Sequence, residues 1–383
     1  MAASPSAAAR SASNYVREAP SEPLPPPLSQ VGIVGWLRTN LFSSIANSVL
    51  SVIGIVLLYK LARGVIDWAL VRAIWHGSDG AACNVEGAGA CWPFIAAKFG
   101  QFMYGRYPDA ERWRVNLVYA LAVAGLVPLM VPQIKGKAWS ALFMFAMFPL
   151  LAFWLLHGGL GLAIVETQFW GGLLVTLVVA TVGIAAAFPL GILLALGRRS
   201  DMPAISWVST GFIELVRGVP LITVLFMASV MLPLFLPPGI TFDKLLRALV
   251  GVSLFSAAYL AEVIRGGLQA VPRGQFEAAD ALGLSYPKKM GLIVLPQALK
   301  LVIPGIVNTF VGLFKDTSLV LIIGLFDLLG VVQQNVQSDP KWASPNTGIT
   351  GYVFAGLIFW AFCFGISRYS AFLERRMAAG ERR

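Results

Sequence analysis

The residues most clearly arranged for a task form a short charged stretch between two long apolar runs. In order, it contains Glu277-Ala278-Ala279, three residues, Gly283, nine residues, and Ile293-Val294-Leu295-Pro296. Small side chains at positions 278, 279 and 281 would let a short helix enter a cleft on a partner, and Glu277 offers a carboxylate to a basic group there. We predict a helix over 275–282 that ends at Gly283, with Ser285 capping the next helix. The stretch would work as a docking knob.

A second candidate is the five-residue motif Glu-x-x-Arg-Gly, which occurs twice. One copy carries Glu214 and Arg217, and the other carries Glu262 and Arg265. Spacing i, i+3 places both charges on one face of a helix. The copies can be ion pairs that anchor helix ends near a membrane surface. Alternatively they surround the inner mouth of a polar pathway, with Tyr259 one turn from Glu262.

A third candidate lies inside the apolar stretch 297–335, where Lys315 and Asp316 precede Thr317 and Ser318. The stretch is too long for one straight helix, so we expect a break at these four residues. Non-helical backbone at membrane depth is tolerated only where it lines protein or water. Either Lys315 and Asp316 neutralise each other, or Asp316 faces a polar cavity together with the two hydroxyls.

The composition is that of a membrane protein. Hydrophobic residues make up 57% of the chain and charged residues 13%, whereas soluble domains carry about 25% charge. The mean hydropathy is +0.74, so the apolar excess must face lipid. The net charge of +10 fits Lys and Arg flanking the spans on the cytoplasmic side. These basic residues are scattered rather than gathered in a stripe, so we expect no nucleic-acid partner.

The apolar runs predict an all-α membrane protein with about eight transmembrane helices, because each run is near the ~20 residues that a bilayer demands. The runs are 41–59, 115–131, 139–156, 171–197, 219–237, 245–264, 297–315 and 350–368. Around the last five spans Lys and Arg lie almost entirely on one side, which places that side and both termini in the cytoplasm. The loop of about 60–114 would then lie outside, although it is also basic.

Two of the three cysteines, Cys83 and Cys91, lie in this outside loop with Gly87 and Gly89 between them. An oxidising compartment would favour a disulfide, and two unpaired thiols are the alternative. A zinc site is not expected, since only His76 is near. The third cysteine lies in the last predicted span and fits plain apolar packing.

The chain divides into three zones by composition. Residues 1–35 are expected to be a disordered cytoplasmic tail, because Ala, Ser and Pro dominate and offer little apolar surface for folding; an ordered docking arm is the alternative. Residues 36–160 would hold extra N-terminal spans with the outside loop. Residues 161–383 would form a transmembrane core with the docking knob.

Several chemistries have no support in the sequence. It contains no Gly-x-x-x-x-Gly-Lys-Ser/Thr phosphate loop, so ATP binding by that route is not expected. Only two histidines are present, His76 and His157, and no nucleophile–base pair or metal-ligand set appears. We therefore expect no catalytic site, no metal and no bound cofactor in this chain.

The stretch that begins at Glu277 resembles, at each fixed position, the EAA loop of the membrane subunits of ATP-binding-cassette importers. Residues 165–383 look like the polar amino-acid branch of these subunits. The resemblance lies in 214–221 (ELVRGVPL), 259–267 (YLAEVIRGG), the EAA loop and 314–319 (FKDTSL). The extra N-terminal spans resemble the longer membrane subunits of general L-amino-acid importers, so the match covers nearly everything after residue 35.

The resemblance implies a five-helix importer core in a bacterial inner membrane. Two homologous permease subunits, usually different, would form the pathway. Two cytosolic ATPases would use ATP and dock at the EAA loop, whose fixed residues are Glu277, Ala278, Ala279, Gly283 and Pro296. A periplasmic binding protein would deliver the amino acid.

For a zwitterionic substrate, Glu262 and Asp316 would face the ammonium group. Backbone N–H groups at the restart of the broken helix would face the carboxylate. The alternative is a secondary transporter driven by an ion gradient. Such a transporter would show repeated halves with interrupted helices, and the first four predicted spans show no such interruption.

Overall fold

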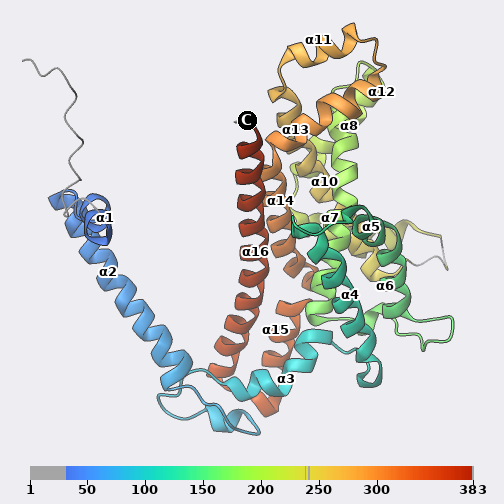
Figure 1. The fold of residues 1–383 in the computed structure, drawn as a ribbon. Helices are drawn as coiled ribbons and strands as arrows, with labels where there is room; N and C mark the ends of the chain where they lie inside the picture. Colours follow the sequence, from blue (N-terminus) through green and yellow to red (C-terminus); the bar gives the residue numbers. More distant parts are fainter. Residues whose placement is uncertain (1–31, 238, 240–241, 382–383) are drawn as a thin grey trace, which may run out of the picture. The chain divides into compact units, whose positions relative to one another are not determined.

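The computed structural model describes residues 32–237, 239 and 242–381 (Figure 1). By its internal contacts the chain divides into two compact units, Met1–Trp68 and Ala69–Arg383. The residues described form helices and no β-strand, in agreement with the all-α prediction. Residues 1–31 of the predicted tail lie outside the described part, and residues 32–35 belong to a helix, α1 (Gly32–Asn40).

The first unit contains α1 and the apolar helix α2 (Ile45–Ile66). Ser44 begins α2 as its N-cap, because its hydroxyl accepts the backbone N–H of Asn47 at 3.1 Å. A π-helical turn continues the apolar run, so that the candidate span covers Ile45–Val71. The predicted span 41–59 therefore begins too early and ends too early.

The second unit contains all later elements. Those used below are η5 (Gly80–Cys83), α3 (Trp92–Tyr104), α4 (Arg112–Met130), α5 (Lys137–Leu142), α6 (Phe148–His157), α7 (Gly172–Arg198), α8 (Pro203–Arg217), α9 (Leu221–Phe226), α10 (Lys244–Ala270), α11 (Arg273–Ala281), α12 (Tyr286–Lys288), η11 (Lys289–Val294), α13 (Leu295–Leu301), α14 (Ile303–Asp316), η12 (Thr317–Ile323), α15 (Leu328–Ser338), η13 (Pro340–Trp342) and α16 (Pro345–Glu381).

Within the described ranges, seven helices are long and apolar enough to cross a membrane. They are Ile45–Val71, Asp109–Met130, Lys137–His157, Gly172–Arg198, Lys244–Ala270, Ile303–Ile323 and Pro345–Met377. An eighth span would be the pair Pro203–Arg217 and Leu221–Phe235, which is bent by 104°. The straight span predicted at 219–237 is therefore only the second arm of a bent pair. Pro220 explains the bend, since proline lacks an N–H and disfavours helical geometry in the residue before it.

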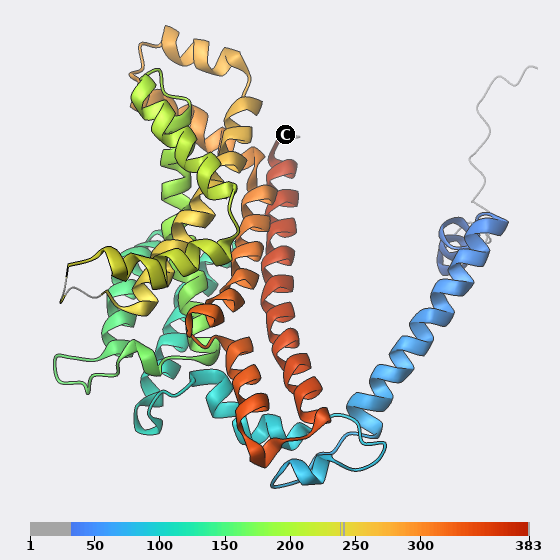
Figure 2. The ribbon, with the colours of Figure 1, turned by 180° about the vertical axis from the view of Figure 1, so that it is seen from behind.

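The centre of the second unit is the packing of α7 against α10 (Figure 2). Glycines let these backbones approach closely. A Cβ on Gly191 would lie 2.8 Å from the Cβ of Leu260, and a Cβ on Gly267 would lie 2.5 Å from the carbonyl oxygen of Ala298 in α13. Such small-residue contacts are typical of helix packing in membranes. These close contacts pack α7, α10 and α13 tightly against one another, and this packing sets the positions of their charged residues.

The predicted domain boundary near residue 160 does not coincide with a gap in the packing. Val118 of α4 and Leu155 of α6 are buried in the same apolar cluster as Leu174 and Val179 of α7. Likewise, α3 packs on α7, α15 and α16. From Ala69 on, the loop that was predicted to lie outside therefore belongs to the compact unit Ala69–Arg383, as do the second and third predicted spans.

The break predicted at 315–318 is wrong. The helix α14 continues into the 3₁₀ helix η12, and the turn comes at Gly324, whose φ is 73°. The predicted apolar segment 317–335 is divided there, and α15 follows with Asp327 as its N-cap. A second interruption lies at Val302, between α13 and α14, where Pro304 occupies the first turn of the new helix.

Candidate functional site

The docking knob predicted from the sequence is the helix α11 and the turn after it. Gly283 has a φ of 68°, and its N–H donates to the carbonyl of Asp280 at 2.9 Å. The N–H of Leu284 donates to the carbonyl of Ala279 at 3.2 Å, which completes a Schellman motif. Gly283 therefore ends α11 as predicted. Ser285 is the N-cap of α12, but its side chain makes no capping hydrogen bond.

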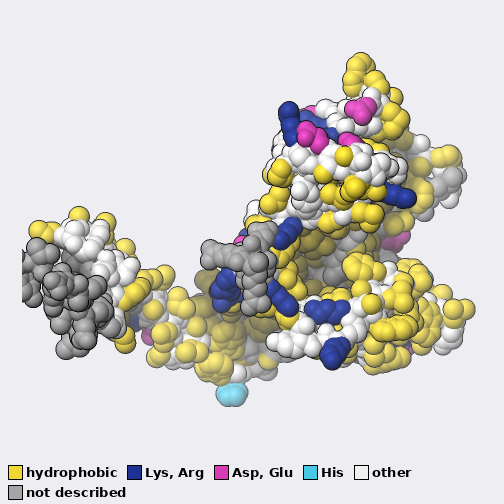
Figure 3. Space-filling model, turned by 45° about the horizontal axis from the view of Figure 1, so that its top comes forward, with side chains coloured by type: hydrophobic (Ala, Val, Ile, Leu, Met, Phe, Trp, Pro, Cys, Tyr) yellow, Lys and Arg dark blue, Asp and Glu magenta, His cyan; other side chains and the backbone are white. Residues whose placement is uncertain are grey.

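The surface of α11 divides into an inner and an outer side. Ala279 is buried, whereas Glu277, Ala278 and Leu282 are exposed. No cation of the described residues lies within ion-pair distance of Glu277. Both ribbon views place α11 at one extremity of its unit, and Figure 3 shows acidic and basic side chains close together at that end. The outer side thus offers small side chains and one unpaired carboxylate.

Three contacts hold α11 to neighbouring elements of its unit. Lys289 of η11 reaches the Asp280 carboxylate at 2.6 Å. The amide of Gln297 in α13 donates to Gln275 at 3.1 Å, and Pro296 stands in the first turn of α13. The third contact comes from Arg199, directly after α7.

Arg199 joins three elements. Its guanidinium carbon lies 5.7 Å from the centre of the Phe276 ring in α11, which is cation–π distance. Its Nη1 donates to the carbonyl of Leu268 in α10 at 2.9 Å. One side chain at the end of α7 therefore contacts both α11 and the end of α10.

The residue before it, Arg198, lies in a cluster of five charged side chains from α7, α8 and α10. Arg198 contacts Glu262 (Nη1 to Oε1, 2.5 Å) and Glu214 (Nη2 to Oε1, 2.8 Å). Arg265 binds Glu262 with Nη2 at 2.8 Å and Nε at 3.1 Å. Arg217 lies 3.7 Å from Glu262 and 5.6 Å from the centre of the Tyr259 ring. We call these five charged residues the arginine cluster.

The ion pairs differ from those expected within each Glu-x-x-Arg-Gly motif. Glu262 does pair with Arg265, three residues later. Glu214, however, pairs with Arg198 of α7, and Arg217 turns to Glu262 of α10. The cluster thus ties three helices together at one level, and its three arginines exceed its two glutamates by one positive charge.

Of the two carboxylates expected to face a substrate ammonium, Glu262 already has arginine partners in this structure. The side chain of Glu262 is 16% exposed, and its carboxylate lies within ion-pair distance of three arginines. At Asp316 the backbone remains helical, and both neighbouring hydroxyls are used inside the helix. The hydroxyl of Thr317 donates to Phe314 O at 2.8 Å and that of Ser318 to Lys315 O at 2.9 Å. The freed backbone groups that would receive a carboxylate are therefore lacking at these four residues.

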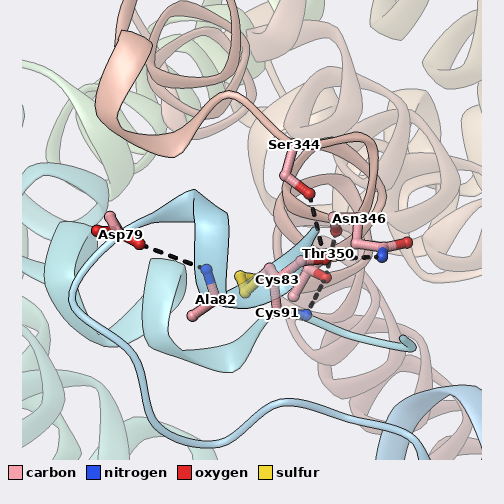
Figure 4. The surroundings of a disulfide bond; sticks show 7 residues. All are labelled: Asp79, Ala82, Cys83, Cys91, Ser344, Asn346 and Thr350. Atoms are coloured by element: carbon pink, nitrogen blue, oxygen red, sulfur yellow. Dashed lines mark hydrogen bonds between the residues drawn. A yellow bond between two sulfur atoms is a disulfide. The ribbon is translucent and has the colours of Figure 1, made fainter. Parts of the chain in front are cut away.

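The loop that holds Cys83 and Cys91 is closed by a disulfide between them, with 5.6 Å between the Cα atoms (Figure 4). Both cysteines are fully buried. The side chain of Asn346 donates to the carbonyl of Cys83 at 3.1 Å, and the N–H of Cys91 donates to the hydroxyl of Thr350 at 2.8 Å. The bridged loop is therefore fastened to the start of α16.

Sequence reasoning missed the roles of Arg198, Arg199 and Phe276. The two arginines directly follow the apolar run 171–197, which marks a helix end at the membrane surface. That signal gave their place but not their partners, because Glu262 stands 64 residues away from Arg198. Phe276 has no sequence signal beyond being apolar.

Comparison with known proteins places this geometry in a family. Residues 187–379 match the model of the family described as "binding-protein-dependent transport system inner membrane component". The matched part contains α10, α11 and the whole arginine cluster.

Two relatives align over almost the whole chain. The chain is 55% identical to the "inner membrane amino-acid ABC transporter permease protein YhdY" of Escherichia coli (strain K12), over 90% of this chain and 93% of the relative. It is 40% identical to the "glutamate/glutamine/aspartate/asparagine transport system permease protein BztC" of Rhodobacter capsulatus, over 96% and 99%.

A shorter relative aligns with only part of the chain. The "probable glutamine ABC transporter permease protein GlnP" of Bacillus subtilis (strain 168) is 34% identical over 54% of this chain and 92% of its own length. The first two relatives therefore share the N-terminal region as well as the core. The chain belongs to the family of binding-protein-dependent transport system inner membrane components.

Proposed function

We propose that the chain is a permease subunit of an ATP-driven importer that carries polar L-amino acids across the bacterial inner membrane. Two full-length relatives are amino-acid permeases by name, which supports this substrate class. The family match leaves the alternative of a gradient-driven transporter without support. ATP would be bound and hydrolysed by partner subunits, and this chain would bind no cofactor of its own.

The observation that carries the proposal is the connection between α11 and the arginine cluster. An ATPase subunit would seat α11 in a cleft and bind Glu277 with a basic group. Any displacement of α11 would move Phe276, and Arg199 packs on Phe276 while it holds the end of α10. Arg198, the preceding residue in the chain, ties α7 to α8 and α10. ATP-driven movement of α11 would thus displace the neighbouring ends of three core helices, α7, α8 and α10.

The proposal sets the orientation and the partners. The end with α11 would face the cytoplasm together with both termini, and the disulfide-bridged loop would face the periplasm. This chain and a second, homologous permease subunit would line the pathway. Two ATPases would bind on the cytoplasmic side, and an amino-acid-binding protein would dock on the periplasmic side.

Reconstitution tests the proposal. The chain is co-expressed with a homologous permease subunit, an ATPase subunit and an amino-acid-binding protein from the same organism, and the complex is placed in proteoliposomes. Uptake of tritiated L-glutamine and L-glutamate should require both ATP inside and binding protein outside. The matched control is the same complex with an ATPase variant that cannot hydrolyse ATP. Uptake that continues with this variant and stops when an imposed ion gradient is collapsed would overturn the proposal.

A further inference from the structure

A cavity of about 300 Å³ lies at the end of the second unit away from α11. Its wall is formed by α3, the start of α7 and α15, which lie side by side in both ribbon views. Six polar side chains line it: Gln101, Arg106, Gln334, Asn335, Ser338 and Asp339. Trp170 adds an apolar wall. The volume stands at the lower end of the range for small-molecule sites, which suits a ligand of a few heavy atoms.

Backbone contacts make the floor of this cavity rigid. A Cβ on Gly105 would lie 2.3 Å from the Cα of Gly171, so only glycine permits this approach. The N–H of Arg106 donates to the carbonyl of Phe169 at 3.1 Å, and the N–H of Gly172 donates to that of Phe326 at 2.9 Å. The N-terminal region and the core thus meet in a fixed geometry before any ligand arrives.

The cavity contains one cationic and one anionic group that are not paired with each other. Arg106 donates from Nη2 to the carbonyl of Gln168 at 3.3 Å, and no carboxylate among the described residues forms an ion pair with it. Asp339 accepts from Lys98 at 2.5 Å and from the backbone N–H of Lys341 at 3.0 Å. The hydrogen bond from Lys98 lowers the pKa of Asp339, so its carboxylate is charged at neutral pH. Carboxylate oxygens can accept more than one bond each.

The neutral polar side chains of the cavity are largely free to bind. Within the described part of the chain, the side chains of Gln101, Gln334 and Ser338 form no hydrogen bond to protein groups. Asn335 donates to the carbonyl of Val331 at 2.9 Å and keeps its own side-chain oxygen. Gln101 and Ser338 are exposed and Gln334 is half-buried, so a polar ligand can bond to them by displacing water rather than protein groups.

We propose that this cavity is an outer binding site for a free L-amino acid, which it holds before the transport step. Arg106 binds the α-carboxylate, Asp339 receives the α-ammonium group, and the side-chain amides hold a polar side chain. The proposal rests on the proposed function for its substrate class and adds a site in which the N-terminal region takes part.

The test is protection of an engineered cysteine in the assembled importer. Ser338→Cys, in a Cys363→Ala background, is labelled from outside by a membrane-impermeant maleimide. L-glutamine or L-glutamate at ten times its Kd should slow labelling about tenfold, because only about one site in eleven then stays empty. Adding Arg106→Gln should raise the half-protecting concentration at least about tenfold, since a charge-assisted bond is lost.

The matched control is Lys341→Cys, whose exposed position is close to Asp339 but does not line the cavity. Its labelling should not respond to amino acids. Equal labelling of Ser338→Cys with and without amino acid overturns the proposal, and so does protection by phosphoethanolamine alone. ATP-driven uptake is measured on the same vesicles. Uptake without protection contradicts only the outer site, whereas absent uptake in the parent complex contradicts the proposed function.

Discussion

Arg198 of α7 lies 2.5 Å from Glu262 of α10, measured between Nη1 and Oε1, although 64 residues separate them. The same guanidinium holds Glu214 of α8 at 2.8 Å. The next residue, Arg199, contacts α11 and the end of α10. Two consecutive arginines therefore connect the docking knob to the three helices whose relative movement would open or close a pathway.

The two glutamates of the arginine cluster should differ in importance. Glu262→Gln removes the charge that faces three arginines and leaves them in mutual repulsion at a site only 16% exposed. We expect a loss of stability of about 3 kcal/mol, typical of breaking a buried ion pair. Glu214→Gln removes one ion pair, with Arg198, at a side chain that is 57% exposed. We expect this variant to lose less than about 1 kcal/mol of stability.

Thermal unfolding of the two variants in the same detergent measures this difference, and ATP-driven uptake should fall more for Glu262→Gln. Equal thermal shifts would mean that the cluster does not centre on Glu262.

Gly283→Val should disturb α11 through the backbone alone. The position has a φ of 68°, and no atom lies within 4 Å of a Cβ added there, so the effect is conformational rather than steric. We expect a cost of about 1–2 kcal/mol to the turn, with weaker capture of the ATPase on affinity beads. Gly283→Asn should be milder, because asparagine tolerates this region. Gly274→Ala, in the same helix without positive φ, is the control that should behave as wild type.

Reversing the charge at Glu277 should weaken the ATPase contact without affecting the fold. Glu277 is exposed on the outer side of α11 and has no ion partner in the described structure. We expect Glu277→Lys to weaken ATPase binding by about tenfold or more, since an attraction becomes a repulsion at an interface. Glu86→Lys makes the same change on an exposed residue of the disulfide-bridged loop. Titration of labelled ATPase into nanodiscs would refute the role of Glu277 if both variants bound alike.

The disulfide should be present in protein from intact cells. Non-reducing mass spectrometry should find the peptides of Cys83 and Cys91 linked, with Cys363 free. Replacing both by serine should cost about 2–3 kcal/mol, because the bridge closes a short loop with a sequence separation of eight. The loosened loop should become sensitive to protease added outside. Alkylation of both cysteines without prior reduction would contradict the bridge.

The sequence predicted the features that depend on local residues. The helix α11, its end at Gly283 and the apolar spans follow from patterns within a few turns of chain. The partners of Glu214 and Arg217 could not be predicted in this way. Their spacing suits a pair within one helix, but Arg198 and Glu262 on neighbouring helices offer better-placed charges. Such choices depend on how α7, α8 and α10 pack.

The error at 315–318 has a related cause. Charged residues inside an apolar run suggested a break, yet the hydroxyls of Thr317 and Ser318 bond to their own helix and let it continue as a 3₁₀ helix. The true interruption at Gly324 shows in the sequence only as a single glycine. The substrate pathway is therefore less predictable than the docking knob.

The last prediction concerns Asp327, a fully buried carboxylate at the start of α15. It accepts the N–H groups of Gly330 at 2.9 Å and Leu329 at 3.2 Å. Burial raises the pKa of Asp327 from an ordinary value of 3.8 to about 6, although the two hydrogen bonds act to lower it. Because the folded pKa is the higher one, the folded state binds the proton more strongly. The contribution of Asp327 to stability is therefore greatest below about pH 4 and declines until about pH 6, by at most about 3 kcal/mol.

Asp327→Asn should remove this decline, since an amide does not titrate. The variant keeps one acceptor oxygen for the helix end and loses one of the two hydrogen bonds, which costs about 1 kcal/mol. At pH 7.5 it should therefore unfold at a higher temperature than the parent, and at pH 4 the two should unfold at similar temperatures, because a protonated carboxyl also keeps only one good acceptor oxygen. The control is Asp243→Asn at the start of α10, an exposed cap that bonds to Leu246 at 3.0 Å. Melting curves of Asp327→Asn that stay parallel to the parent at both pH values would show that Asp327 does not titrate in this range.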